Sequence, residues 1–120
     1  MKKICVKEAN EVEIQFRDKT FVATFNMRAV MFMQEELNKI GLERISFVHF
    51  AAIVLYAGIR ANNEDYTMDE AKALAMTISP ADLNSIVEEY VQSVNGVSVA
   101  ENEEQLKKVI AQMLGKGNTQ

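Results

Sequence analysis

The stretch that decides the fold is "SFVHFAAIVLYAGI", residues 46–59, in which apolar side chains occupy almost every position. Its length corresponds to about four turns of α-helix, which favours a helix over a strand. A helix that is apolar all round must be buried on all sides. We therefore predict that residues 46–59 form the central helix of the fold. The run is too short, and too interrupted by Ser46 and His49, to cross a bilayer, so we expect no membrane association.

The segment before this run predicts an amphipathic helix over residues 27–40, "MRAVMFMQEELNKI". Asn26 is a suitable N-cap, and Gly41 can end the helix by adopting a positive φ angle in the left-handed conformation. Phe32 falls on the polar side of the helical wheel, among Arg28, Glu35, Glu36 and Lys39. Phe32 is thus either a contact for a partner or a second copy of the chain, or a residue that the hairpin or another helix covers. The apolar stripe comprises Ala29, Val30, Met33, Leu37 and Ile40, with Met27 and Met31 at its edge.

The N-terminal segment predicts a β-hairpin. Val12, Ile14 and Phe16 alternate with polar residues, which is the period of a strand with one solvated face. Residues 17–19, "RDK", supply a turn, and residues 20–25 are rich in β-branched and aromatic side chains. Residues 3–6 are a possible third strand. An isolated hairpin is barely stable, so we expect it to pack on the helices.

Capping motifs predict two further helices downstream. "TMDE", residues 67–70, matches a capping box, and "SPAD", residues 79–82, places Ser79 at the cap and Pro80 at the first helical position. A last helix is expected over about 101–114, and the "GKGNTQ" tail at 115–120 is expected to be disordered. The second of the capped helices carries a stripe of Leu83, Ile86, Val87, Tyr90, Val91 and Val94.

These elements predict a mostly α, α+β fold: a bundle of about five helices with a small N-terminal antiparallel hairpin. The chain has 120 residues, enough to bury one core, and no linker divides it. We expect a single domain over residues 1–114, with the hairpin at about 3–25 and the helical body at 26–114.

The charge distribution argues against a nucleic-acid partner. The net charge is −4, and between residues 61 and 104 the only base is Lys72. Nucleic-acid surfaces normally show clustered lysine and arginine. The acidic half is either a solvated face or a docking surface for a basic partner. The single cysteine, Cys5, excludes an internal disulfide, and a cytoplasmic location is the simplest expectation.

No motif predicts catalysis. The only histidine, His49, lies in the apolar run and is expected to be a buried structural residue, and Cys5 is expected to be a packed thiol. The glycines form neither GxGxxG nor a P-loop, and the acidic loop "NNEDYTMDE" lacks the spacing of a calcium-binding loop. We therefore predict a protein that is not an enzyme and has no catalytic, cofactor-binding or metal-binding residues.

Two segments carry a family resemblance. The first is "VEIQFRDKTFVATFNMRAVMFMQEEL", a hairpin that runs directly into a helix with a Glu-Glu pair. The second is "LYAGIRANNEDYTMDEAKAL", an apolar helix end, an Asn/Asp-rich loop and a Thr-capped acidic helix. Together they resemble the tail assembly chaperones of long-tailed bacteriophages and prophages over roughly residues 10–94. Ile59 stands where leucine is commoner, and the stretch after Asn95 has no matching motif.

The resemblance implies a non-enzymatic chaperone that coats the long, hydrophobic and helical tape measure protein and keeps it soluble before tail tube subunits polymerise around it. The tail tube protein is a possible second partner. Such a chaperone is expected in the bacterial cytoplasm as a homo-oligomer, with a frameshifted longer product in many relatives. Candidate partner-binding residues are Phe32, Tyr56, Gly58 and Arg60. In this interpretation residues 56–60 close the central helix and hold the acidic helix against it, and Gly58 permits the close approach of a neighbour. The alternative for these residues is a plain helix C-terminus in a stable fold. The alternative is a small acidic adaptor or regulatory subunit that binds a single protein partner.

Overall fold

The computed structural model describes residues 1–6, 8–41 and 45–94. Within these ranges the chain is mostly helical with an N-terminal antiparallel hairpin, which confirms the predicted fold class. The predicted last helix at 101–114 and the tail at 115–120 lie outside the described residues. The elements, in order, are β1 (Glu11–Phe16), β2 (Lys19–Thr24), α1 (Met27–Ile40), α2 (Phe47–Arg60), α3 (Met68–Thr77) and α4 (Pro80–Val94).

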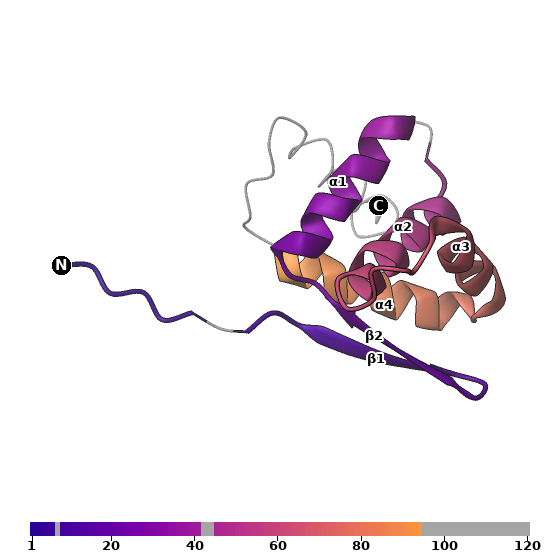
Figure 1. Ribbon diagram of the computed structural model, residues 1–120, viewed down its shortest axis with the longest axis horizontal. Helices are drawn as coiled ribbons and strands as arrows, with labels where there is room; N and C mark the ends of the chain where they lie inside the picture. The colour runs from indigo at the N-terminus through magenta and orange to yellow at the C-terminus, as the bar shows by residue number, and fades with distance from the viewer. Residues whose placement is uncertain (7, 42–44, 95–120) are drawn as a thin grey trace, which may run out of the picture.

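Helix α2 is the centre of the fold, as its composition predicted. Every residue from Phe50 to Ile59 is buried. The helix packs against α1, α3, α4 and β2, so that the other elements surround it (Figure 1). Burial of a fully apolar side chain contributes roughly 1.5–3 kcal/mol, so this one helix supplies a large share of the core. None of the described helices has the length and apolarity needed to cross a bilayer.

The helix starts follow the predicted caps. The Asn26 side chain accepts a hydrogen bond from the Ala29 amide at 3.0 Å, and Ser79 accepts one from Asp82 at 3.2 Å. Thr67 and Glu70 form a complete capping box, in which each side chain accepts from the other residue's backbone N–H. Gly41 ends α1 with φ +83°, as expected, although its ψ of 136° lies outside the left-handed helical region.

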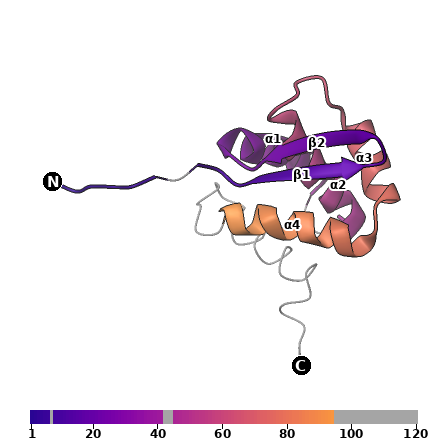
Figure 2. The ribbon, with the colours of Figure 1, turned by 90° about the horizontal axis from the view of Figure 1, so that it is seen from below.

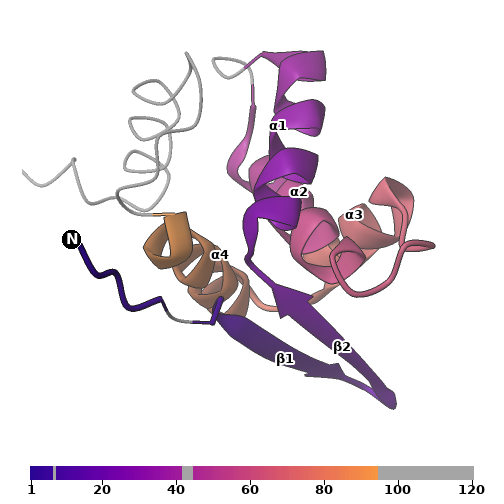
Figure 3. The ribbon, with the colours of Figure 1, turned by 60° about the vertical axis from the view of Figure 1, so that its left-hand side comes forward.

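The hairpin lies across the helices and presents one face to α2 (Figure 3). Its register pairs Val12 with Ala23, Ile14 with Phe21 and Phe16 with Lys19. Ile14 and Ala23 are buried, whereas the alternate β1 residues Glu11, Glu13 and Gln15 are exposed. The period of two in the sequence therefore places the apolar face of the sheet on the core.

Residues 3–6 do not form the third strand that the sequence allowed. Residues 1–6 have no regular structure and leave the body at the start of β1 (Figures 1 and 2). The side chains of Ile4 and Val6 are 71% and 86% exposed, and Cys5 is exposed rather than packed. A strand is stabilised by its hydrogen-bonded neighbour and a packed face, and this segment has neither here. We call residues 1–6 the N-terminal arm.

Candidate partner-binding surface

Three of the four predicted partner-binding residues meet where α1 crosses the C-terminal end of α2. The Arg60 guanidinium lies 4.5 Å from the centre of the Phe32 ring and 5.5 Å from that of Tyr56. The two rings are 6.3 Å apart between centroids, and Arg60 Nη1 donates a hydrogen bond to the Tyr56 hydroxyl. A cation over an aromatic face contributes about 0.5–2 kcal/mol, more when partly buried. The Phe32–Tyr56–Arg60 cluster therefore fastens α1 to α2.

Local structure explains this cluster. Tyr56 and Arg60 are four residues apart on α2, so their side chains share one face. Arg60 also lies in the last turn, where a cation is favoured by the helix dipole. The two side chains contact Phe32 of α1, so the cluster joins α2 to α1. Helix α3 also packs on α2.

Phe32 is 8% exposed, so α2 covers it, which is the second of the two alternatives predicted for this residue. The helical wheel misplaced it because α1 buries a wider arc than a single stripe. Arg28 also lies 5.8 Å from the Phe32 ring, and long arginine side chains can cover an apolar ring while keeping their charge solvated. Ile40, placed in the stripe by the wheel, is instead 36% exposed.

Gly58 lies on a different side of α2 and contacts the hairpin. A Cβ at this position would stand 2.6 Å from Phe25 Cε1 and 2.8 Å from Ala23 Cβ. The sequence predicted that Gly58 allows a close approach, and the neighbour is strand β2 of the same chain together with the residue that follows it. Gly58 is thus required for internal packing.

The exposed apolar side chains of the helices are mainly methionines. Met27 and Met31 are 61% and 54% exposed and lie four residues apart on α1, so they form one surface. Arg28, between them in sequence, pairs with Glu64 at 3.4 Å. Met76 on α3 is 73% exposed. The flexible thioether chain adapts to irregular apolar partners, so Met27 and Met31, called here the methionine surface, can accept a helix of variable sequence.

The two candidate reactive residues, His49 and Cys5, lie in different parts of the fold. His49 is only partly buried, which corrects the expectation of a buried histidine, because it lies in the first turn of α2 where the core ends. It borders a hollow of about 170 Å³ with Val48, Ala52, Lys72 and Met76. Cys5 is exposed in the N-terminal arm. Among the described residues, no group of three or more His, Cys, Asp or Glu is placed to hold a metal ion.

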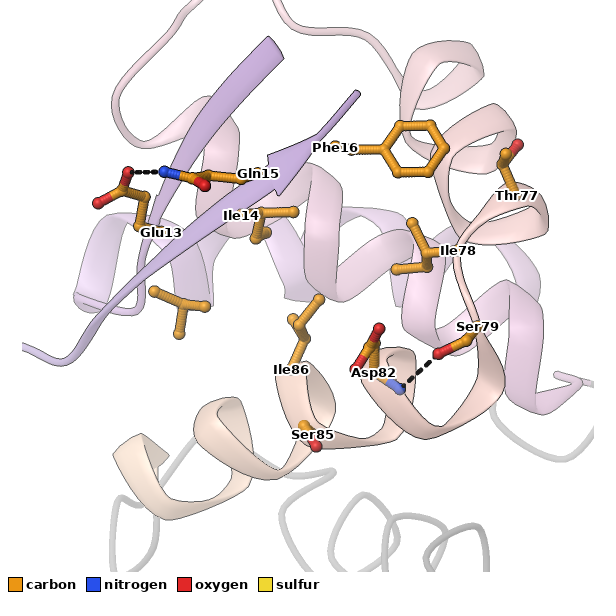
Figure 4. A pocket seen from close by; sticks show the side chains of 11 residues that line it. Glu13, Ile14, Gln15, Phe16, Thr77, Ile78, Ser79, Asp82, Ser85 and Ile86 are labelled. Carbon is orange, nitrogen blue, oxygen red and sulfur yellow. Dashed lines mark hydrogen bonds between the residues drawn. The ribbon is translucent and has the colours of Figure 1, made fainter. Parts of the chain in front are cut away.

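A groove between β1 and α4 has no signal in the sequence, because the strand and the helix are far apart in the chain. Its volume is about 360 Å³. Ile14, Ile78 and Ile86 point into it, and the Ser79–Asp82 cap forms one end (Figure 4). We call it the β1–α4 groove, and it is lined by Val12, Glu13, Ile14, Gln15, Phe16, Thr77, Ile78, Ser79, Asp82, Ser85 and Ile86.

The titratable groups with shifted pKa values belong to the core or to surface pairs. Burial, followed by the charge of Glu70, raises the pKa of Tyr66 to about 12, and its hydroxyl has no hydrogen-bond partner in the described part of the chain. Burial also raises the pKa of Tyr90. The hydrogen bond and charge of Glu36 raise the pKa of Lys39. None of these groups is poised near neutral pH for proton transfer.

No protein-family model, curated protein or solved structure matches the chain.

Proposed function

We propose that this protein is a non-enzymatic tail assembly chaperone of a bacteriophage or prophage, which binds the tape measure protein in the bacterial cytoplasm and keeps it soluble. The observation that carries the proposal is the methionine surface on α1. Met27 and Met31 are large apolar side chains of α1 that remain in solvent, although the fold buries most of α2 and the apolar face of α1. Exposed apolar surface of this kind is typical of binding sites.

The chemistry of the methionine surface suits a helical client. An amphipathic helix binds through apolar side chains repeated at three- and four-residue intervals. Met27 and Met31 have this spacing, and Arg28 and Glu64 beside them supply a charged border. Methionine contacts are adaptable, so one surface can bind many different turns of a long client.

The Phe32–Tyr56–Arg60 cluster has a supporting role in this function. It lies on the buried side of α1, with the methionine surface on the exposed side. A rigid scaffold loses less entropy on binding than a flexible one. The "LYAGIR" part of the resemblance, residues 55–60, thus holds α1 in place, and α1 presents the methionine surface.

A tape measure protein offers many similar helical sites, so each contact can be weak if several copies of the chaperone bind together. Linking binding events raises the overall affinity by about 10²–10⁴ without new contacts. We therefore expect copies of the chain to self-associate along the client and to be displaced by tail tube protein.

Co-expression tests the proposal. The tape measure protein of the same tail gene cluster is produced with and without this chain, and its soluble fraction is measured. We expect the wild-type chain to raise that fraction and Met27→Gln/Met31→Gln to reduce the gain, because glutamine keeps the size of the side chain but is costly to desolvate.

Met76→Gln is the matched control, since Met76 is an exposed methionine on another helix. It should leave the gain intact. Unchanged solubility with the wild-type chain would contradict the chaperone proposal, and equal loss with both variants would contradict the assignment to the methionine surface.

A second candidate is an acidic adaptor that docks on one basic partner. It is favoured by the exposed acids Asp65, Asp69 and Glu70 at the start of α3. In the described part of the chain the ion pairs are Arg28–Glu64 and Lys39–Glu36, so these three carboxylates take part in none. Binding through them would weaken steeply with salt, whereas binding to the methionine surface would not. The salt dependence of client binding separates the two.

A further inference from the structure

The outer edge of β1 is open. The Phe25 amide donates to the Asn10 carbonyl at 3.0 Å, which fixes which pairs of the antiparallel ladder exchange hydrogen bonds. Alternation then directs the backbone groups of Glu11, Glu13 and Gln15 away from β2. Within the described ranges, no backbone hydrogen bond reaches these groups. An edge of this kind is a template for another extended segment.

The outer edge of β2, by contrast, is partly occupied by a side chain of the same molecule. Asn62, in the loop after α2, donates to the Val22 carbonyl at 3.0 Å and to Thr24 Oγ1 at 2.8 Å. This side chain occupies part of the backbone edge of β2. Strand addition is therefore favoured on β1.

A groove lies beside the open edge of β1. The β1–α4 groove lies between β1 and α4 (Figure 4). Strand β1 has β2 on one side and α4 on the other (Figure 2). A strand added to β1 would direct every second side chain toward Ile14, Ile78 and Ile86 and the others to solvent. The groove thus selects an extended segment that alternates apolar and polar residues.

The chain contains such a segment in its N-terminal arm. Ile4 and Val6 alternate with Lys3 and Cys5, and all of them are exposed. Lys2 and Lys3 are the only charged side chains of the arm, whereas Glu11 and Glu13 border the edge and Asp82 lines the groove. The arm therefore complements the edge in apolar pattern and in charge.

We propose that the N-terminal arm of a second copy of this chain adds to the open edge of β1, antiparallel, with Ile4 opposite Ile14 and Val6 opposite Val12. In this register Cys5 lies directly opposite Glu13, and Lys3 is the diagonal neighbour of Glu13. The arm leaves its own body at the start of β1 and runs away from it, so it reaches a neighbouring molecule without reversing direction (Figure 2).

Pairing of two β1 edges is the competing arrangement. In an antiparallel pair of β1 strands, the outward-facing backbone groups of Glu11, Glu13 and Gln15 would face those of the second copy. The register that pairs all of these groups places Glu13 directly opposite Glu13 of the second copy. Like charges in directly opposed positions destabilise a sheet. The glutamates on this edge strand therefore disfavour pairing with another β1 edge, whereas they attract a basic arm.

The proposal rests only on the self-association part of the proposed function, so its test uses the purified chain without a client. Glu13→Cys is oxidised mildly with the native Cys5, and the products are separated without reductant. We expect a covalent dimer, because opposed residues in neighbouring strands lie within the 4.4–6.8 Å between Cα atoms that a disulfide needs.

Thr20→Cys is the matched control, on the same sheet face but on β2, two strands from the arm and so too distant for the bond. The wild-type chain, oxidised in the same way, measures how much dimer forms by chance collision of two Cys5 thiols. A disulfide within one chain would overturn the assignment to a second copy. A yield of dimer no higher than in the control would overturn strand addition altogether.

Sedimentation equilibrium of the full chain gives an independent measurement. Cys5→Pro removes an amide that would donate to β1, and we expect association to weaken about tenfold. Cys5→Ser keeps the amide and should associate like the wild type. Equal association of both variants would overturn the proposal. Loss of client solubility with intact self-association would instead contradict the chaperone function alone.

Discussion

Gly58→Ala is expected to destabilise the protein, although alanine is the better helix former. The new Cβ would lie 2.6 Å from Phe25 Cε1 and 2.8 Å from Ala23 Cβ, whereas carbon atoms prefer about 3.5–4.0 Å. Both neighbours are buried, at 3% and 0% exposure, and Phe25 packs edge-on against Tyr90 at 5.8 Å. Overpacking of this kind costs about 1–3 kcal/mol, and helix propensity returns up to about 1 kcal/mol. Because both contacts are shorter than 3.0 Å and both neighbours are buried, the overpacking cost lies in the upper part of this range, about 2–3 kcal/mol, and the net expected loss is about 1–2 kcal/mol.

Urea unfolding followed by circular dichroism measures this loss, which for a domain near this size corresponds to a fall in Tm of roughly 5–15 °C. Phe25→Leu provides the partner of a double-mutant cycle, because it removes the ring atom that Cβ would meet. Gly58→Ala should cost less in the Phe25→Leu background. A stabilised Gly58→Ala, or an equal cost in both backgrounds, would refute the argument that the hairpin requires glycine here.

Phe32→Ala should lower the free energy of unfolding by about 3 kcal/mol in the same assay, because the ring is buried beneath α2; an unchanged stability would mean that it is instead a free contact residue. Thr67→Ala should cost about 1 kcal/mol through loss of the capping box with Glu70, as measured by urea unfolding. Tyr66 has a folded-state pKa of about 12, above its ordinary value near 10, so its contribution to stability is present below pH 10 and is lost as pH rises through 12. Tyr66→Phe should therefore make the decline in stability between pH 10 and 12 less steep, as measured by unfolding at several pH values, and an unchanged slope would contradict this.

The four predicted helices that fall on described residues depend on local physics and were found where expected. Asn26, Thr67 and Ser79 each satisfy backbone N–H groups a few residues away, and such short-range hydrogen bonds can be predicted from the order of residues alone. The apolar run of α2 likewise required burial, whatever surrounds it. The period of two in β1 placed Ile14 inside and Glu13 outside.

The site residues were only partly predictable. Spacing puts Tyr56 and Arg60 on one face of α2, but the identity of their partner, Phe32, depends on how α1 crosses that helix. The partial exposure of His49 follows from where the core stops, which no residue near it reveals. The β1–α4 groove joins residues more than sixty positions apart and had no sequence signal.

The order of residues by itself determined the mostly helical fold, the helix starts and the apolar faces, since these follow from hydrogen bonds and periodicities within a few residues. Only tertiary structure decided that Gly58 receives the hairpin, that Phe32 is covered while Met27 and Met31 are left in solvent, and that β1 has an open edge beside a groove. Those outcomes depend on which surfaces meet, and packing between distant segments is a property of the whole chain.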